Sequence, residues 1–183
     1  MTCRASLLLA TLAGVLVTGC SGGSDKPTTL PPITPTPKPS ATAAPVVVPS
    51  AARVHDAFGA AAFVRFYYAQ LNRAWSLPDG QLLAPLSDPE CGTCKSYVET
   101  AQELTKNGQR LEGNSVNVTA VEAPPEENGI VAVDLFFDQP ARSIVSTTGA
   151  VIKVFPLQKA FHKTVYVEKV PQGWLVRAVK VAV

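Results

Sequence analysis

The stretch IVAVDLFFD, residues 130–138, alternates between apolar and more polar positions. The apolar positions are Val131, Val133, Leu135 and Phe137, and the positions between them are Ala132, Asp134, Phe136 and Asp138. A period of two is typical of a strand that buries one face. Val116 and Val118 begin the same pattern upstream, and apolar runs predict further strands at about residues 142–147, 151–157, 164–170 and 174–182. The second half of the chain is therefore predicted to be an antiparallel meander.

The first half of the folded region has the period of a helix instead. Apolar residues recur in steps of three and four at Val54, Phe58, Ala61, Val64, Tyr68, Leu71 and Trp75, which predicts one buried helical face. Pro78-Asp79-Gly80 ends this helix, and Asp79 is expected to cap a short second one. Asp88 and Pro89 are expected to cap and begin a third helix, which Asn107-Gly108 closes. This order predicts an α+β fold with N-terminal helices packed on one face of the sheet.

The N-terminus, MTCRASLLLATLAGVLVTGC, has the layout of a secretory signal peptide. Its apolar run is shorter than the about 20 residues that a spanning helix needs. Val17-Thr18-Gly19-Cys20 matches the bacterial lipobox, which implies removal of residues 1–19 and lipidation of Cys20. An ordinary signal peptide with a chance cysteine is the alternative. Two acyl chains suffice for stable anchoring, so we expect a protein held by lipid on the extracytoplasmic face of the cell membrane.

Residues 20–50 are predicted to be the lipidated cysteine and a disordered Pro/Thr-rich linker. Half of the chain's 16 prolines fall here, and proline holds the backbone extended and solvated. The α+β domain is then expected at residues 51–183. The chain has 16 basic and 14 acidic residues, and loss of Arg4 with the signal peptide leaves it near neutral. No clustered basic surface is evident, so nucleic acid is not an expected partner.

The segment ECGTC contains Cys91 and Cys94, the two cysteines left once Cys3 is removed and Cys20 carries lipid. An exported pair without a leftover thiol favours a structural disulfide. A thiol–disulfide redox centre is the alternative, because a helix N-terminus lowers a thiol's pKa. No strand or βαβ pattern precedes the motif, which disfavours that interpretation. A metal half-site would need two further Cys or His ligands.

The sequence offers few other residues that could serve in catalysis or metal binding. His55 is expected at an exposed helix start, and His162 has no evident partner in the sequence. We expect no catalytic residue, metal site or cofactor. The candidate pocket residues are Phe63, Tyr67, Tyr68, Trp75 and Asp134. The aromatic ones are interpreted first as core and Asp134 as a solvent-facing sheet residue, while an acid–base pair of Tyr68 and Asp134 is the enzymatic alternative.

Three segments carry a resemblance to a known family: AAFVRFYYAQLNRAW, LAPLSDPECGTCKSYVETAQEL and the closing GWLVRAVKVAV. Over roughly residues 52–183 the chain resembles a family of actinobacterial lipoproteins known as a domain of unknown function. The order of helices and sheet is also similar to the nuclear-transport-factor-2-like (NTF2-like, SnoaL-like) cone fold. That resemblance implies a curved sheet wrapped over the helices and a pocket between the sheet and the first helix.

Three functions from different classes are consistent with these observations. The leading hypothesis is a non-enzymatic, membrane-anchored module that binds an envelope protein or a small apolar ligand. The second is a thiol–disulfide oxidoreductase that uses Cys91 and Cys94. The third is an NTF2-like pocket enzyme that uses Tyr68 and Asp134.

Overall fold

The computed structural model of this chain describes residues 46–182. Cys20, the signal sequence and most of the predicted linker lie outside the described residues, so those predictions stay predictions. The helical elements are η1 (Ser50–Arg53), α1 (Ala57–Ser76), η2 (Gly80–Leu82), η3 (Ala84–Leu86) and α2 (Gly92–Lys106). The strands are β1 (Gln109–Glu112), β2 (Asn117–Glu122), β3 (Ile130–Gln139), β4 (Arg142–Ser146), β5 (Val151–Phe155), β6 (Gln158–Val170) and β7 (Gly173–Val181). No helix among these residues is long and apolar enough to cross a bilayer.

Helix α1 begins three residues later than the apolar pattern predicted. Asp56 is its N-cap, and the Asp56 side chain accepts a hydrogen bond of 2.7 Å from the Gly59 backbone N–H. This bond satisfies one of the free amide groups at a helix start. Val54 is extended, and its carbonyl accepts a hydrogen bond of 2.8 Å from the Trp174 indole on β7. The tertiary contact therefore removes Val54 from the helix.

Helix α2 also begins later than predicted, at Gly92 with Cys91 as its N-cap. The expected start at Asp88 and Pro89 was wrong. The Asp88 backbone N–H donates to the Val176 carbonyl on β7 at 2.8 Å, and Ser87 bridges the same strand. Pairing to the sheet holds Ser87 extended, and residues 88–91 form a turn closed by the Cys91 N–H bond to the Asp88 carbonyl at 3.0 Å. The predicted cap of the short helix at Asp79 is confirmed, because its side chain accepts from the Gln81 N–H.

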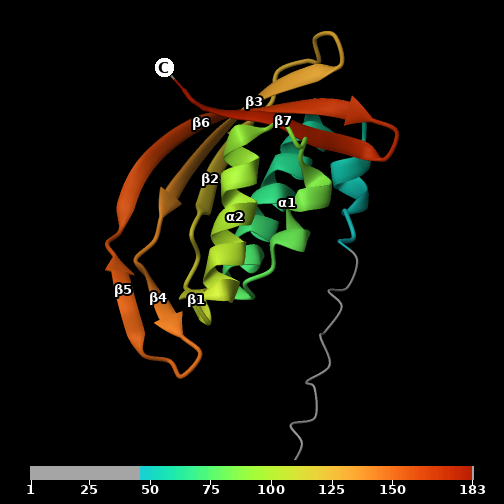
Figure 1. The fold of residues 1–183 in the computed structure, drawn as a ribbon. Coiled ribbons are helices and arrows are strands. Elements are labelled where there is room, and N and C mark those ends of the chain that lie inside the picture. Colours follow the sequence, from blue (N-terminus) through green and yellow to red (C-terminus); the bar gives the residue numbers. More distant parts are fainter. Residues whose placement is uncertain (1–45, 183) are drawn as a thin grey trace, which may run out of the picture. The chain divides into compact units, whose positions relative to one another are not determined.

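The described strands form two antiparallel sheets, one with the order β2-β3-β6-β7 and one with the order β1-β4-β5. The chain continues from β3 into β4 and from β5 into β6, so that the two sheets share one long bent hairpin (Figure 1). Pro140 and Pro156 lie at its two bends. Proline lacks the N–H that a strand ladder uses, which explains why both strands break at this level. The sheet curves over the helices, as the sequence predicted.

Strand β1 was not predicted. It follows α2 directly and pairs with β4, with Leu111 opposite Ile144. Strand β6 begins at Gln158, earlier than the predicted residue 164, and pairs with β3 along most of its length. The predicted meander is wrong, because β3 pairs with β6 and not with β4, and the strands form two sheets. The α+β arrangement, with helices packed on one sheet face, is as predicted.

The core lies between the helices and the inner face of the four-stranded sheet. The apolar positions of the IVAVDLFFD stretch are all buried, and so are Val165 and Val167 on β6. Opposite them lie Phe63, Tyr67 and Leu71 of α1. Complete burial of a Val, Leu or Phe side chain contributes roughly 1.5–3 kcal/mol, so this inner face is the main source of stability.

The start of the domain is clamped to β7. Besides the Trp174 bond to Val54, the His55 ring lies edge-on to the Trp174 indole at 5.8 Å. A side chain at Gly59 would come within 1.8 Å of the Val54 carbonyl oxygen, so only glycine fits there. Val54 and His55, just before α1, are thus held between Trp174 of β7 and Gly59 of α1.

Candidate functional site

The predicted pocket aromatics lie inside the core. Phe63, Tyr67 and Tyr68 are completely or almost completely buried on α1. The Phe137 ring stacks against Tyr68 and Phe161, with centroids 6.3 and 5.3 Å away. Trp75 is half-buried and donates its indole N–H to the Tyr97 carbonyl at 3.0 Å. These side chains fill the space between α1 and the sheet in which a cone fold would place a ligand.

Two polar groups in this cluster lack a partner among the described residues. The hydroxyls of Tyr67 and Tyr68 are buried without a hydrogen bond. Burial, followed by the neighbouring Tyr97, raises the pKa of both phenols well above the ordinary value. Tyr97 itself accepts a bond of 3.0 Å from the Lys163 ammonium, which also lies over the Phe137 ring. The phenols are therefore neutral at physiological pH and are poor proton acceptors.

Asp134 lies on the other face of the sheet. Its neighbours Val133 and Leu135 point into the core, whereas Asp134 is half-exposed on the outer face. Tyr68 and Asp134 are thus not brought together. The structure instead gives His162 the partner that the sequence did not reveal: the His162 ring nitrogen lies 3.0 Å from an Asp134 carboxylate oxygen.

This outer-face group does not have the order of a nucleophilic triad. The Thr164 hydroxyl donates to the same Asp134 oxygen at 3.1 Å, so it is oriented by the carboxylate and not by the imidazole. A Ser/His/Asp site needs the hydroxyl on the histidine. Phe136 stacks on His162 at 4.2 Å, which makes the group an ordinary cross-strand cluster.

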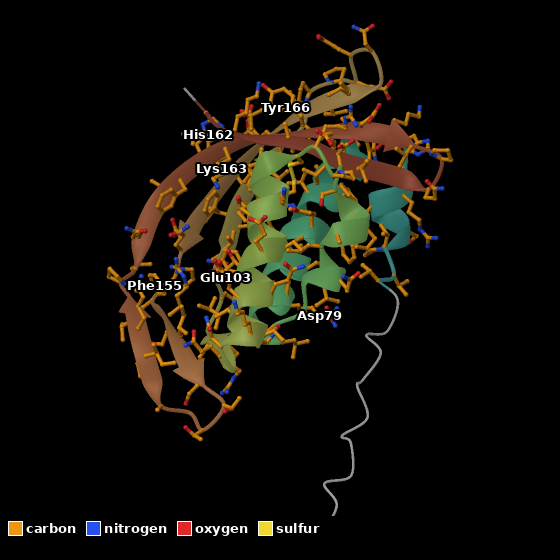
Figure 2. All side chains as sticks on the ribbon, viewed as in Figure 1. Asp79, Glu103, Phe155, His162, Lys163 and Tyr166 are labelled. Atoms are coloured by element: carbon orange, nitrogen blue, oxygen red, sulfur yellow. A yellow bond between two sulfur atoms is a disulfide. The ribbon has the colours of Figure 1, made fainter. Side chains whose placement is uncertain are left out.

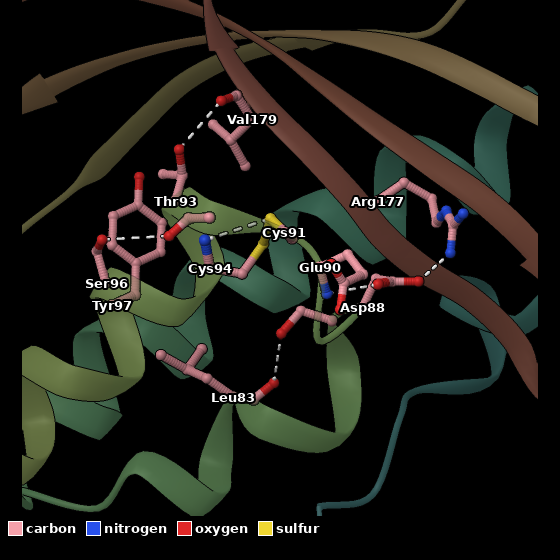
Figure 3. The surroundings of a disulfide bond; sticks show 12 residues. Leu83, Asp88, Glu90, Cys91, Thr93, Cys94, Ser96, Tyr97, Arg177 and Val179 are labelled. Carbon is pink, nitrogen blue, oxygen red and sulfur yellow. Dashed lines mark hydrogen bonds and ion pairs between the residues drawn. A yellow bond between two sulfur atoms is a disulfide. The ribbon is translucent and has the colours of Figure 1, made fainter.

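Cys91 and Cys94 form a disulfide, as predicted. It closes the first turn of α2, where the Cys94 N–H points at the Cys91 sulfur (Figure 3). The two residues are 2% and 1% exposed. Thr93 ties the same turn to β7 through a bond to the Val179 carbonyl. A buried bridge within the first turn of a helix fits the structural role and leaves an attacking thiolate little access.

The hollows described for residues 46–182 are not lined by the core aromatics. The roomiest of those described, about 410 Å³, lies beside the disulfide over Ala84, Ser87, Asp88, Pro89, Lys95 and Val98. Another of about 330 Å³ lies between α1 and β2. The described residues contain no group of three His, Cys, Asp or Glu side chains placed to hold a metal ion.

A feature that sequence reasoning missed is the exposure of β5. Val151, Ile152 and Val154 are 61%, 52% and 65% exposed, and Leu157 just after the strand is also exposed. Val154 and Val151 lie opposite Ser143 and Val145 of β4, on one face, and Ile152 is the unpaired residue of a bulge between them. The β4–β5 hairpin, which we define as residues 142–157, extends from the rest of the sheet away from α1 (Figure 1). The sequence predicted a strand at about residues 151–157 but gave no prediction of its exposure.

The same hairpin carries positive charge that no acidic side chain offsets. Arg142 and Lys153 both lie 4.8 Å from the centre of the Phe155 ring, and Figure 2 shows Phe155 far down the hairpin from His162 and Lys163. Burial lowers the pKa of Arg142, since water is partly excluded from its guanidinium. No Asp or Glu occurs in residues 139–167. The ion pairs found within residues 46–182 involve neither Arg142 nor Lys153.

A family of unknown function, DUF6318, matches residues 32–179 of this sequence. The chain belongs to the DUF6318 family. The resemblance to a domain-of-unknown-function family is thereby confirmed, while the lipoprotein assignment stays a prediction. No curated protein matches this DUF6318 chain.

Solved structures of similar architecture come from several sources. One is the intermembrane space region of the chloroplast protein ARC6, with 14% identity, a TM-score of 0.49, and coverage of 69% of this chain and 98% of that one. A second is Aln2 from a Streptomyces species, with 12% identity, a TM-score of 0.43, and 64% and 87% coverage. A third is an NTF2-like protein of unknown function in nutrient uptake from Rhodospirillum rubrum, with 14% identity, a TM-score of 0.41, and 66% and 98% coverage.

Proposed function

We propose that this DUF6318 protein is a lipid-anchored module of the extracytoplasmic membrane face whose domain docks a partner protein on the β4–β5 hairpin. The observation that carries the proposal is the exposed apolar strand β5 at a free sheet edge. Contiguous exposed apolar surface in a soluble domain marks interaction sites. A protein partner is favoured over a small apolar ligand, because the aromatics of the predicted pocket fill their own space.

The anchor part rests on the sequence. The lipobox places a nucleophilic thiol at Cys20, and the proline-rich segment after it would hold the domain away from the bilayer. In this arrangement the hairpin stays accessible to a neighbouring envelope protein. The lipid supplies location and the domain supplies recognition.

Two enzymatic alternatives receive less support from the geometry. A redox centre needs an accessible sulfur, whereas both cysteines are buried. A pocket enzyme using Tyr68 and Asp134 needs both groups in one cavity, whereas the sheet separates them. The binding function needs only the surface that the hairpin presents.

The anchor is tested with the Cys20→Ala chain, which should leave the membrane fraction and appear in the medium. Cys3→Ala is the matched control, and it should stay with the membrane because residue 3 is removed with the signal peptide. Membrane retention of the Cys20→Ala chain would overturn the anchoring proposal.

Docking is tested in intact cells with a photoreactive amino acid placed at Val154. Leu77, at the end of α1, is the matched control because it is 62% exposed against 65% for Val154. We expect a discrete crosslinked product from position 154 that an additional Ile152→Lys substitution removes, and no such product from position 77. Equal crosslinking from both positions, or none from 151, 152 and 154, would refute docking at the hairpin.

A further inference from the structure

Strand β5 is an uncovered apolar edge. The edge of β7 is covered, because Ser87 bridges Val176 and the Asp88 N–H donates to the Val176 carbonyl. Strands β1 and β2, which also lie at sheet edges, carry polar and charged residues in the sequences QRLE and NVTAVE. Proteins normally blunt free edges in these ways. On β5, the only such features are Lys153 and the bulge at Ile152, and the other four residues of the strand are apolar.

The unpaired backbone groups of β5 favour contact with another polypeptide strand. A strand at a sheet edge has N–H and C=O groups on one side that pair with no other strand of its sheet. An extended polypeptide can pair with these groups and place its alternate side chains against the strand. A bilayer cannot pair with them, and lipid-exposed unpaired backbone groups are costly. The hairpin also lacks Trp and Tyr, the residues enriched at membrane interfaces.

The positive charges of the hairpin indicate the charge that a partner would carry. Arg142, Lys153 and Lys159 lie on or beside the hairpin, and the acid-free run extends from residue 139 to 167. Glu112 on β1 is nearby in the sheet but already faces Arg110 at 3.6 Å. A partly desolvated cation without a counter-charge is stabilised when a carboxylate approaches. An acidic partner would therefore be favoured over a neutral or basic one.

A second copy of this chain fits less well. Antiparallel pairing of two β5 strands centred on residue 153 would place two Lys153 ammonium groups opposite each other. Like charges directly opposite across a pair of strands are destabilising. The edge is therefore complementary to something other than itself.

We propose that β5 binds an extended, acidic segment of a partner protein, in which apolar and acidic residues alternate, as an added strand of the β1-β4-β5 sheet. This inference rests on the proposed function and names the partner's chemistry. The apolar positions of the segment contact Val151, Ile152 and Val154. Its carboxylates lie near Lys153 and Arg142.

The test begins with a random dodecapeptide library displayed on phage and selected against the full-length protein in neutral detergent. We expect the enriched peptides to alternate apolar residues with Asp or Glu. A synthetic copy of the best peptide should slow amide hydrogen exchange in residues 151–155 and leave β7 unchanged. Its affinity, followed by fluorescence anisotropy, should fall as salt rises.

Charge reversal then separates the partner's chemistry from docking itself. Lys153→Glu should weaken the acidic peptide about tenfold and strengthen a copy in which Lys replaces each acidic residue. Lys180→Glu is the matched control: Lys180 is also exposed and lies 5.2 Å from the Tyr166 ring centre, on a different strand. It changes the net charge equally and should change affinity less than twofold.

The outcomes are distinguishable. Protection at β5 by peptides without acidic residues, unaffected by Lys153→Glu, would overturn the acidic partner and leave the docking function standing. Enrichment of no peptide, or protection elsewhere, would overturn the strand addition, while the crosslinking test would still judge the hairpin. Protection of β5 that grows with protein concentration alone would assign the edge to a second copy. Protection by phosphatidylglycerol vesicles without peptide would assign it to a membrane.

Discussion

The two halves of the long hairpin differ sharply, although the chain passes from one to the other without a helix between them. In the proximal half, β3 and β6 bury an unbroken row of side chains under α1. In the distal half, β4 and β5 also pair, in a register that contains one bulge, yet β5 leaves Val151, Ile152 and Val154 exposed. The same kind of sequence therefore performs two tasks. Where a helix covers the strand it provides stability, and where nothing in residues 46–182 covers it, it provides a surface.

The largest test of this contrast compares two phenylalanines. Phe137→Ala should lower the free energy of unfolding by about 3–5 kcal/mol, the cost typical of a buried aromatic. Phe155→Ala, at a half-buried position on the exposed strand β5, should cost about 1 kcal/mol or less. Urea unfolding followed by circular dichroism measures both. Similar losses for the two variants would show that the distal half contributes to the core after all.

The buried hydroxyls of Tyr67 and Tyr68 make the stability of the core depend on pH. Their folded pKa values are raised by burial, so the folded state keeps both protons above pH 10 while the unfolded state loses them. Stability contributed by the neutral phenols is complete below pH 10 and falls as pH rises beyond it, by about 1 kcal/mol per pH unit for each tyrosine. Unfolding at pH 9, 10 and 11 measures the slope. Tyr68→Phe should roughly halve it, and an unchanged slope would contradict the assignment.

The disulfide should behave as part of the core. Cys91→Ser with Cys94→Ser should reduce the free energy of unfolding by about 1–2 kcal/mol, less than the roughly 3 kcal/mol that the chain-entropy model gives for a 15-residue loop. In the native protein the bridge should resist mild reductants, because both sulfurs are buried. Mass spectrometry after reduction and alkylation gives the readout. Rapid alkylation of the folded protein without loss of stability would revive the redox hypothesis.

The smallest expected change in stability comes from removing the hydroxyl oxygen of Tyr68. Tyr68→Phe should stabilise the domain by about 1 kcal/mol at neutral pH, because it removes a buried hydroxyl without a partner. Tyr97→Phe is the control and should destabilise by about 1 kcal/mol, since it breaks the bond from Lys163. A loss of stability in the Tyr68 variant would mean that its hydroxyl has a partner in solution.

Local patterns predicted much of the fold. The alternation of residues 130–138 identified β3 and its buried face, and steps of three and four identified α1. Strand β1 was not predicted because its sequence, QRLE, has one apolar residue and its partner, β4, is remote in sequence. The starts of both α-helices shifted because Trp174 and Val176 on β7 bind Val54 and Asp88, contacts that no local propensity contains.

The candidate site was harder to predict for the same reason. Burial of Phe63, Tyr67 and Tyr68 follows from helical spacing. The meeting of His162 with Asp134 depends on the register between β3 and β6, which the sequence leaves open. The exposure of β5 depends on where the helices end, because a run such as VIKVF is equally suited to an interior. Exposed apolar surfaces of this kind become visible only when the tertiary structure is known.

The clamp at Trp174 has a mechanical consequence for a chain held at Cys20. Any pull along the tether reaches the domain through residues 46–54, and the Trp174–Val54 bond transfers it to β7 before it reaches α1. If the proposed lipid at Cys20 anchors the chain, this connection would spread tension over the ladder between β7 and β6. The domain would then keep its shape when pulled by the proposed anchor or by the partner proposed to bind the hairpin.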